Sequence, residues 1–188
     1  MAMEILETLR KTCKERNIPI ISVATEQFLS KLLRKHKPKI CVEIWGAVGY
    51  SSIYMGGILN SWWGKITSFE ISYPAYLQGL QNNKEAHCYN VISYPYDVRY
   101  APIKKLVQTQ QAQGPVDFIF IDGQKTQYGE YMEIIEKISS PHTVIVIDDV
   151  IKYHNKIQSL YGYLQKKQIN YKILQLEPDD GVMVIHSS

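Results

Sequence analysis

A short apolar run, followed at once by a glycine-bearing turn and a helical segment, constrains this fold more than any other feature. Residues 40–44 read Ile-Cys-Val-Glu-Ile, the pattern of a strand buried on both faces, with one acid, Glu43, near its end. Gly46 and Gly49 follow, and then comes a helix-length segment that ends near Asn60. This order opens a doubly wound α/β domain, in which ligands bind outside the carboxyl ends of the strands.

The rest of the chain alternates between apolar runs and amphipathic stretches, which predicts five βα repeats and a terminal hairpin in a three-layer α/β fold. Glycine and proline mark the boundaries, and Pro74 suits the first turn of its helix. The predicted helices are 4–16, 25–36, 51–60, 74–85, 103–110, 128–138 and 156–167, and the predicted strands are 40–44, 65–70, 89–92, 116–122, 143–147, 171–176 and 182–186.

Composition indicates an ordinary globular protein with one full core. The chain has 188 residues, of which 45% are hydrophobic and 21% charged, and its net charge of +3 permits a polyanionic partner without requiring one. Cys13, Cys41 and Cys88 form no C-x-x-C pair, which argues against a disulfide scaffold or zinc site and favours a reducing cytoplasm. Since no apolar run is long enough to cross a bilayer and the start lacks a signal-peptide pattern, we expect a cytoplasmic protein without a membrane partner.

Acidic residues recur at or just after the predicted carboxyl ends of the strands. One acid there is unremarkable as a helix cap, but six along one edge repel each other unless positive charge, hydroxyls or a metal lie between them. Oxygen-only ligands favour magnesium, manganese or calcium over zinc. The six acids are Glu43, Glu70, Asp97, Asp122, Asp148 and Asp149, of which the last three come from neighbouring strand ends and are candidates for one divalent cation.

Four motifs in order carry a resemblance to a known family. They are V-E-I-W-G-A-V-G-Y-S-S, I-T-S-F-E-I, D-F-I-F-I-D-G-Q-K-T-Q-Y and I-V-I-D-D-V. The chain resembles the metal-dependent class I S-adenosylmethionine O-methyltransferases, the catechol and caffeoyl-CoA O-methyltransferase group with its bacterial relatives. The resemblance covers nearly everything from Asn17 onward, including Pro19-Ile20-Ile21-Ser22 and Asp180-Gly181.

The resemblance implies a fold, a cofactor and a role for individual residues. The expected fold is a Rossmann-like single domain over 1–188, with a mostly parallel seven-stranded sheet, an antiparallel last strand and a helical segment, 1–38, packed on it. The expected cofactors are S-adenosylmethionine and Mg²⁺, or Mn²⁺ or Ca²⁺ in its place, and the expected assembly is a homodimer. The implied metal ligands are Asp122, Asp148 and Asp149, the implied base is Lys125, and the implied cofactor-binding residues are Glu43 and Ser51 near the methionine end, Glu70 at the ribose, Asp97 beside the adenine, and Gly46, Gly49 and Asp122.

The chemistry of methyl transfer agrees with these roles. Transfer from a sulfonium to an oxygen is an in-line displacement in which an oxyanion is the better nucleophile. A divalent metal lowers the pKa of a bound hydroxyl, and burial beside a cation lowers the pKa of a lysine, so Lys125 is expected to act as the base.

Trp45 departs from the family pattern, which has glycine at this position. An indole there fills space needed by the methionine part of the cofactor, or forces a different turn, so a degenerate binding protein is one alternative. Trp62 and Trp63 also stand where the family tolerates glycine or small polar residues. A codon read as glycine in the native host would explain all three tryptophans.

The substrate stays open at this level. A small vicinal diol such as a catechol suits a metal that chelates two oxygens, and we take a small hydroxylated molecule as the expected substrate. A hydroxylated uridine of transfer RNA is the alternative, since basic residues over 31–39 and Arg10, Lys11, Lys14 and Arg16 would track phosphates. A metal-dependent hydrolase is a further alternative, with His142 and His154 the only histidines near the aspartates in sequence.

Overall fold

A seven-stranded sheet forms the centre of the molecule. This computed structural model describes residues 2–110 and 114–186. The strand order is β3-β2-β1-β4-β5-β7-β6, and only β7 runs against the others, as expected for a mostly parallel sheet with an antiparallel last strand. The strands are β1 Ile40–Ile44, β2 Lys65–Phe69, β3 Val91–Tyr94, β4 Val116–Ile121, β5 Ser139–Ile147, β6 Lys172–Gln175 and β7 Gly181–His186.

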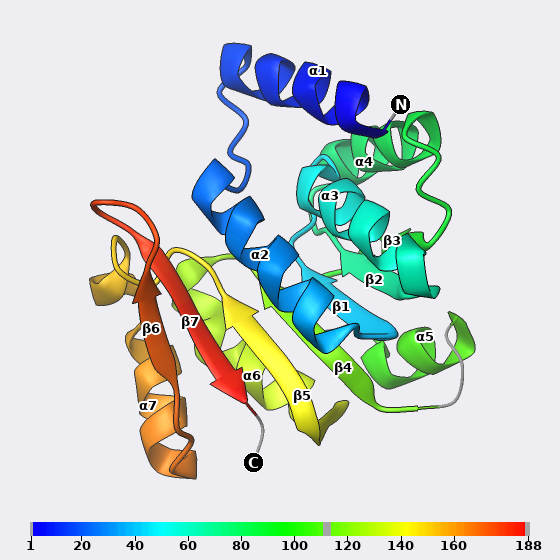
Figure 1. The fold of residues 1–188 in the computed structure, drawn as a ribbon. Helices are drawn as coiled ribbons and strands as arrows, with labels where there is room; N and C mark the ends of the chain where they lie inside the picture. Colours follow the sequence, from blue (N-terminus) through cyan, green and yellow to red (C-terminus); the bar gives the residue numbers. More distant parts are fainter. Residues whose placement is uncertain (1, 111–113, 187–188) are drawn as a thin grey trace.

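Helices cover both faces of this sheet, which gives three layers (Figure 1). The first four helices lie on one face and the last three on the other. The helices are α1 Ala2–Glu15, α2 Val23–His36, α3 Tyr50–Leu59, α4 Tyr73–Glu85, α5 Ile103–Gln110, α6 Tyr128–Ile135 and α7 Gln158–Lys167, with 3-10 turns η1 Asn60–Trp62, η2 Lys125–Gln127 and η3 His154–Lys156.

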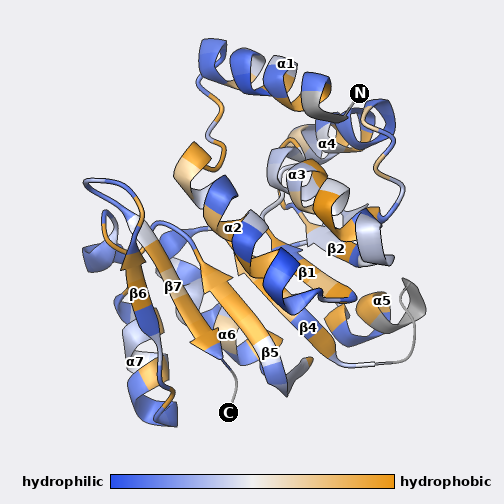
Figure 2. Cartoon of the chain, in the orientation of Figure 1, coloured by the Kyte–Doolittle hydropathy of each residue, from blue (hydrophilic) through white to orange (hydrophobic). Residues whose placement is uncertain are grey.

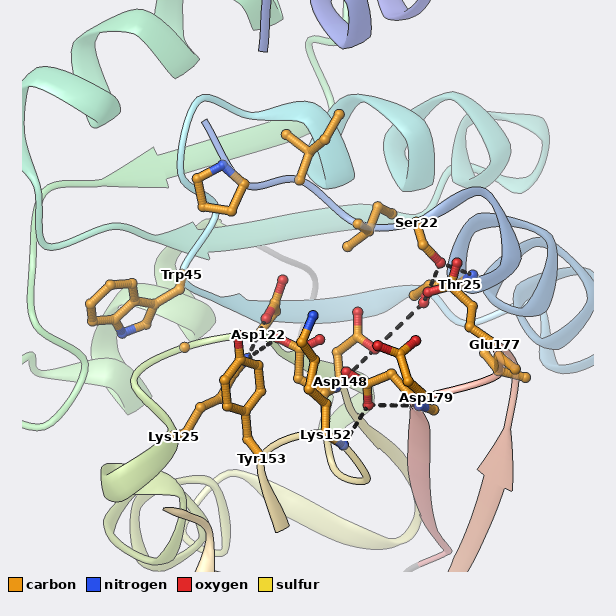
Figure 3. A pocket seen from close by; sticks show the side chains of 18 of the residues that line it. Ser22, Thr25, Trp45, Asp122, Lys125, Asp148, Lys152, Tyr153, Glu177 and Asp179 are labelled. Atoms are coloured by element: carbon orange, nitrogen blue, oxygen red, sulfur yellow. Dashed lines mark hydrogen bonds and ion pairs between the residues drawn. The ribbon is translucent and has the colours of Figure 1, made fainter. Parts of the chain in front are cut away.

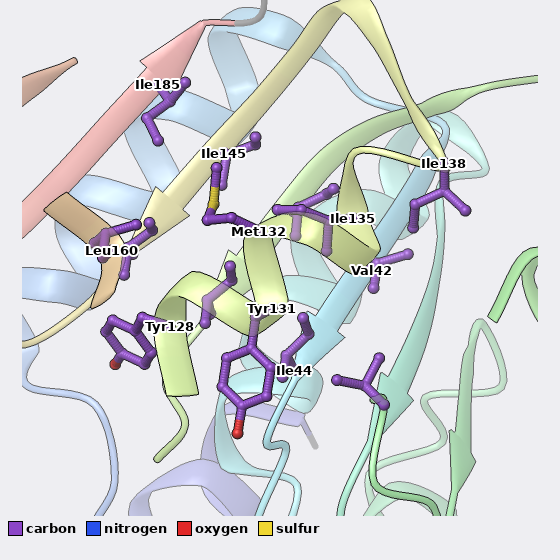
Figure 4. Close-up of a cluster of buried hydrophobic side chains, with 14 of the residues drawn as sticks. Val42, Ile44, Tyr128, Tyr131, Met132, Ile135, Ile138, Ile145, Leu160 and Ile185 are labelled. Carbon is purple, nitrogen blue, oxygen red and sulfur yellow. The ribbon is translucent and has the colours of Figure 1, made fainter. Parts of the chain in front are cut away.

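Alternating side chains divide the core into two clusters, one on each face of the sheet. In β1, Val42 and Ile44 pack toward α6, whereas Cys41 packs toward α3. The central strands are orange along their length in Figure 2, which is the pattern of strands covered on both faces. In Figure 4, Tyr128 and Tyr131 of α6 lie against this sheet, and both are fully buried.

Most element boundaries agree with those predicted to within a few residues, and the largest difference lies at β5. This strand begins at Ser139 instead of Thr143, because its pairing with β4 shifts register between Val116 and Phe118. Such an irregularity accommodates Pro141, which cannot donate to the ladder.

The predicted third strand is displaced for a local reason. Asn90 turns its amide to the carbonyls of Gly56 and Gly64, so β3 begins only at Val91.

The three cysteines are free and buried. Within the described part of the chain, no helix is long and apolar enough to cross a membrane. Helices α1 and α2 both contact α3, so these two helices lie on the α3 side of the sheet.

Candidate active site

The carboxyl ends of the parallel strands form one rim, of which one half lies over β4 and β5 and the other over β1, β2 and β3. A cavity of 460 Å³ lies over the ends of β4 and β5 and is lined by Asp122, Asp148 and Asp149 among others. We call this cavity the acid pocket. A small void of 10 Å³ lies at the glycine turn and is lined by Gly46 and Glu70 among others.

Lys125 pairs with two of the three aspartates of the acid pocket, and Figure 3 shows it beside Asp122. Its Nζ is 2.8 Å from Asp122 Oδ1 and 2.7 Å from Asp149 Oδ2, and it also donates to the Tyr128 hydroxyl at 2.8 Å. Tyr128 in turn donates to the Asp148 carbonyl at 3.1 Å. The sequence therefore brings the predicted base and the predicted metal ligands together in one cluster.

Asp148 lacks a cationic partner within this cluster. Its Oδ1 accepts from the Thr25 hydroxyl at 3.4 Å and from the Asp149 amide at 3.0 Å. Burial, together with the charges of Asp122 and Asp149, raises the pKa of Asp148 well above its ordinary value. Asp148 is thus a buried carboxylate whose negative charge is incompletely balanced.

The lowering of the Lys125 pKa was expected beside a bound cation and stays a prediction, whereas the protein side chains by themselves raise this pKa. Burial alone would lower it, but the carboxylates of Asp122 and Asp149 outweigh burial and raise the pKa of the amine. Lys125 is therefore an ammonium that two carboxylates hold in place. Its proton becomes transferable only if another cation takes over those carboxylates.

Three aspartates supply the oxygen donors that a hard divalent cation prefers, so the chemistry of the donor set fits such an ion. Among the described residues, however, no three His, Cys, Asp or Glu side chains are arranged to hold a metal as they stand. In this arrangement the Lys125 ammonium pairs with two of the three aspartates, Asp122 and Asp149.

Glu43 lies beneath the glycine turn and faces the interior. It is fully buried and accepts from Ser51 Oγ at 2.6 Å, from Ser68 Oγ at 2.6 Å and from Ser52 Oγ. Burial raises the pKa of Glu43, and the three hydroxyls oppose that rise. A Cβ at Gly46 would collide with Ser68 Oγ and reach within 2.9 Å of Glu43 Oε2, so glycine is needed there for close approach.

Glu70 and Asp97 occupy the rim on the other side of β1. Glu70 accepts from the Ala47 amide at 2.8 Å and from the Ser72 amide at 2.6 Å. Asp97 accepts from the Arg99 guanidinium at 2.6 to 3.0 Å, and these hydrogen bonds lower the pKa of Asp97. Their expected roles at the cofactor's ribose and adenine stay predictions.

Trp45 projects from the glycine turn over the start of the loop after β4. Its backbone is left-handed, with φ of 72°, and Ala47 and Gly49 are left-handed as well. The indole Nε1 donates to the Tyr131 hydroxyl at 2.9 Å. Its Cδ1 would lie 2.6 Å from a Cβ at Gly123, so the ring is packed directly on that glycine.

The sequence reasoning missed several residues that complete the acid pocket. Thr25 bonds Asp148, and Asp180 accepts from the amides of Ile151, Lys152 and Gly181 beside the pocket. Thr25 was expected only as a helix start. The segments 19–22 and 180–181 carry part of the family resemblance and also line the pocket. They were therefore the sequence signal from which these residues could have been found.

Comparison with known proteins gives a consistent result. A family model described as O-methyltransferase matches residues 2–180. A caffeoyl-CoA O-methyltransferase from Stellaria longipes is 29% identical over 150 residues, which cover 79% of this chain and 62% of that protein. A catechol O-methyltransferase from Niastella koreensis is 30% identical over 140 residues, which cover 73% of this chain and 62% of that protein. The chain therefore spans less than two thirds of the length of these two relatives.

Solved structures show the same fold. An O-methyltransferase from Bacillus cereus in complex with SAH superposes with a TM-score of 0.79 at 24% identity, covering 97% of this chain and 90% of that chain. The O-methyltransferase TomG from Streptomyces achromogenes, in complex with SAM, gives a TM-score of 0.79 at 19% identity, covering 98% and 90%.

Proposed function

Since this chain belongs to the O-methyltransferase family, whose model matches residues 2–180, we propose that it transfers a methyl group from S-adenosylmethionine to a hydroxyl of a small vicinal diol, with a divalent cation as cofactor. The observation that carries the proposal is the convergence of Asp122, Asp148 and Asp149 with Lys125 in a cavity of 460 Å³. A cavity of this size lies in the range of small-molecule sites.

The proposed roles follow from position. Asp122, Asp148 and Asp149 would hold a divalent cation, which supplies a Lewis acid that lowers the pKa of a substrate hydroxyl. S-adenosylmethionine supplies the activated methyl group, and Glu70, at the end of β2, would accept hydrogen bonds from its ribose hydroxyls.

Lys125 is the proposed base. Its amine reaches Asp122 and Asp149 from η2, so it lies beside any oxygen bound among the aspartates. With a cation balancing those carboxylates, the amine would lose the charges that raise its pKa and could accept the hydroxyl proton. Tyr128, which accepts a hydrogen bond from Lys125, keeps the amine directed into the pocket.

Transfer RNA as substrate finds less support in the geometry. The basic residues Lys31, Arg34, Lys35, Lys37 and Lys39 surround the end of α2. His36 at that end contacts His186, which pairs with Val144, the residue where the continuous pairing of β5 with β4 begins. The basic cluster therefore lies at the edge of the sheet opposite the acid pocket.

The hydrolase alternative is weaker still, because neither candidate histidine points at the aspartates. His142 is exposed at the amino-terminal part of β5, and His154 lies 3.2 Å from the Tyr161 hydroxyl.

The free buried cysteines fit a cytoplasmic location. The homodimer stays a prediction, which light scattering of the purified protein tests.

The test is a methyl-transfer assay with labelled S-adenosylmethionine at saturating concentration, run against a catechol and against total transfer RNA. We expect label in the catechol and none in RNA. Label in RNA alone would replace the substrate class, and phosphoester hydrolysis without methyl transfer would contradict the proposal.

A further inference from the structure

The loop after β5 carries two of the three candidate metal ligands, and its backbone amides are bonded one after another. The Asp148 amide donates to the Ile121 carbonyl at 2.9 Å, and the Asp149 amide donates to Asp148 Oδ1 at 3.0 Å. The Val150 amide donates to the Gly181 carbonyl at 3.1 Å. The loop is therefore bonded to β4 where it starts and to β7 two residues later.

Asp180 bonds the next two amides of this loop. Its Oδ1 accepts from the amides of Ile151 and Lys152, each at 3.3 Å, and from the Gly181 amide at 2.7 Å. Asp180 is 7% exposed and directly precedes β7. A buried carboxylate is costly unless it is hydrogen-bonded, and these three amides meet that need. One side chain thus joins the loop after β5 to the start of β7.

The charge of Asp180 does not explain why an acid lies at this position. Burial and the neighbouring Asp149 carboxylate raise the pKa of Asp180, whereas the amides of Gly181 and Lys152 oppose the rise. A further acid beside Asp149 therefore adds repulsion to a pocket that is already acidic. The backbone amides are what favour an acceptor oxygen here, so the contribution of Asp180 lies in holding the loop.

We infer that Asp180 is a positioning residue for Asp148 and Asp149, because it holds the loop that presents both carboxylates to the acid pocket. The identity of the ligand, a divalent cation, rests on the proposed function. Removing a group that orients metal ligands without touching the metal typically lowers metal affinity by about 10–100-fold. Asp180 acts through backbone amides, so the acceptor oxygen matters more than the negative charge.

The experiment is calorimetry on the full chain and its variants, with Mn²⁺ alone and separately with S-adenosylhomocysteine. Asp180→Ala removes the acceptor and should bind Mn²⁺ about 10–100-fold more weakly. Asp180→Asn keeps an acceptor oxygen without the charge and should bind Mn²⁺ nearly as well as the parent chain. Asp180→Ser, whose shorter side chain reaches fewer amides, should fall between them and replaces the alanine variant if that one does not fold. Affinity for S-adenosylhomocysteine should stay the same, since Asp180 lies beside the acid pocket and not at the glycine turn.

Two further variants separate positioning from charge and from general stability. Asp179→Ala removes one exposed charge from the lining of the same pocket (Figure 3), so it should weaken Mn²⁺ binding less than Asp180→Ala does. Asn90→Ala removes two hydrogen bonds to backbone carbonyls elsewhere, so it should lower the Tm and leave Mn²⁺ affinity unchanged. Without metal, the amides of Ile151 and Lys152 should exchange hydrogen faster in Asp180→Ala than in the parent chain.

The outcomes separate this inference from the proposed function. Equal Mn²⁺ affinity in the parent chain and Asp180→Ala would overturn the positioning role and leave the function standing. Binding by Asp180→Asn as weak as that of Asp180→Ala would overturn it as well, since charge would then be the cause. A parallel loss of affinity for S-adenosylhomocysteine would show general damage to the fold and would also overturn it. No Mn²⁺ binding by the parent chain would overturn the metal assignment and the positioning role with it.

Discussion

The two halves of the rim hold acids in different surroundings. Over β1 and β3 the acids have donors of their own, three serine hydroxyls for Glu43 and one guanidinium for Asp97. In the acid pocket, the ammonium of Lys125 pairs with Asp122 and Asp149, and Asp148 accepts only from the Thr25 hydroxyl and the Asp149 amide. Acids with complete partners maintain the architecture, whereas acids that lack balancing charge are the ones able to bind a cation.

The largest effect should come from Lys125→Met, which removes the base and keeps most of the volume of the side chain. We expect kcat to fall by about 10²–10⁴, the usual worth of general acid–base catalysis. Raising the pH should partly rescue the variant, because solvent then removes the hydroxyl proton. Lys84→Met, at an exposed position of α4, is the matched control. Wild-type turnover by Lys125→Met would show that the lysine is not the base.

The same variant also tests whether the Lys125 ammonium competes with a cation for the aspartates of the acid pocket. In the parent chain the Lys125 Nζ bonds Asp122 and Asp149. Removing this positive charge should therefore tighten Mn²⁺ binding instead of weakening it. Calorimetry with Mn²⁺ on the parent chain and on Lys125→Met measures the difference. Weaker binding by the variant would mean that the ammonium does not compete with the cation.

Glu43→Ala should affect stability and not the acid pocket. The change leaves the hydroxyls of Ser51, Ser52 and Ser68 without their acceptor, at a cost of roughly 2–3 kcal/mol in the free energy of unfolding. Glu43→Gln keeps an acceptor oxygen and should cost less. Denaturant unfolding of the three proteins decides, and equal stability would show that the hydroxyls find other partners.

The smallest effect should be the pH dependence of Asp97→Asn. Arg99 lowers the pKa of Asp97 in the folded state, so the ionised carboxylate stabilises the fold at a pH above its unfolded pKa of about 3.9. The variant should lose about 1 kcal/mol at neutral pH. This difference should shrink as the pH falls through the lowered pKa. A constant difference from pH 7 to pH 2 would exclude the ion pair as its cause.

Much of the fold was predictable because its signals are local. The apolar runs of β1 and β4 stand out from the rest of the sequence, and the order of such runs along the chain implies a parallel sheet. The start of β5 was missed since it depends on a register shift against β4, a contact between distant segments.

The candidate site was predictable only as a set of residues. The rule that strand ends share one edge places Asp122, Asp148 and Asp149 together. It does not say that Lys125 lies between two of them, or that Glu43 turns inward to three hydroxyls, because side-chain partners depend on the turn after each strand. The left-handed backbone of Trp45 is a property of that turn as well.

The most direct test of the account is the initial rate of methyl transfer to a catechol during a titration with Mg²⁺, at saturating S-adenosylmethionine. The account predicts a rate that rises with Mg²⁺, reaches a plateau and returns to background with excess chelator, and Asp148→Asn should show no such rise. A full rate in the presence of chelator would contradict the claim that the unbalanced aspartates exist to bind a catalytic cation.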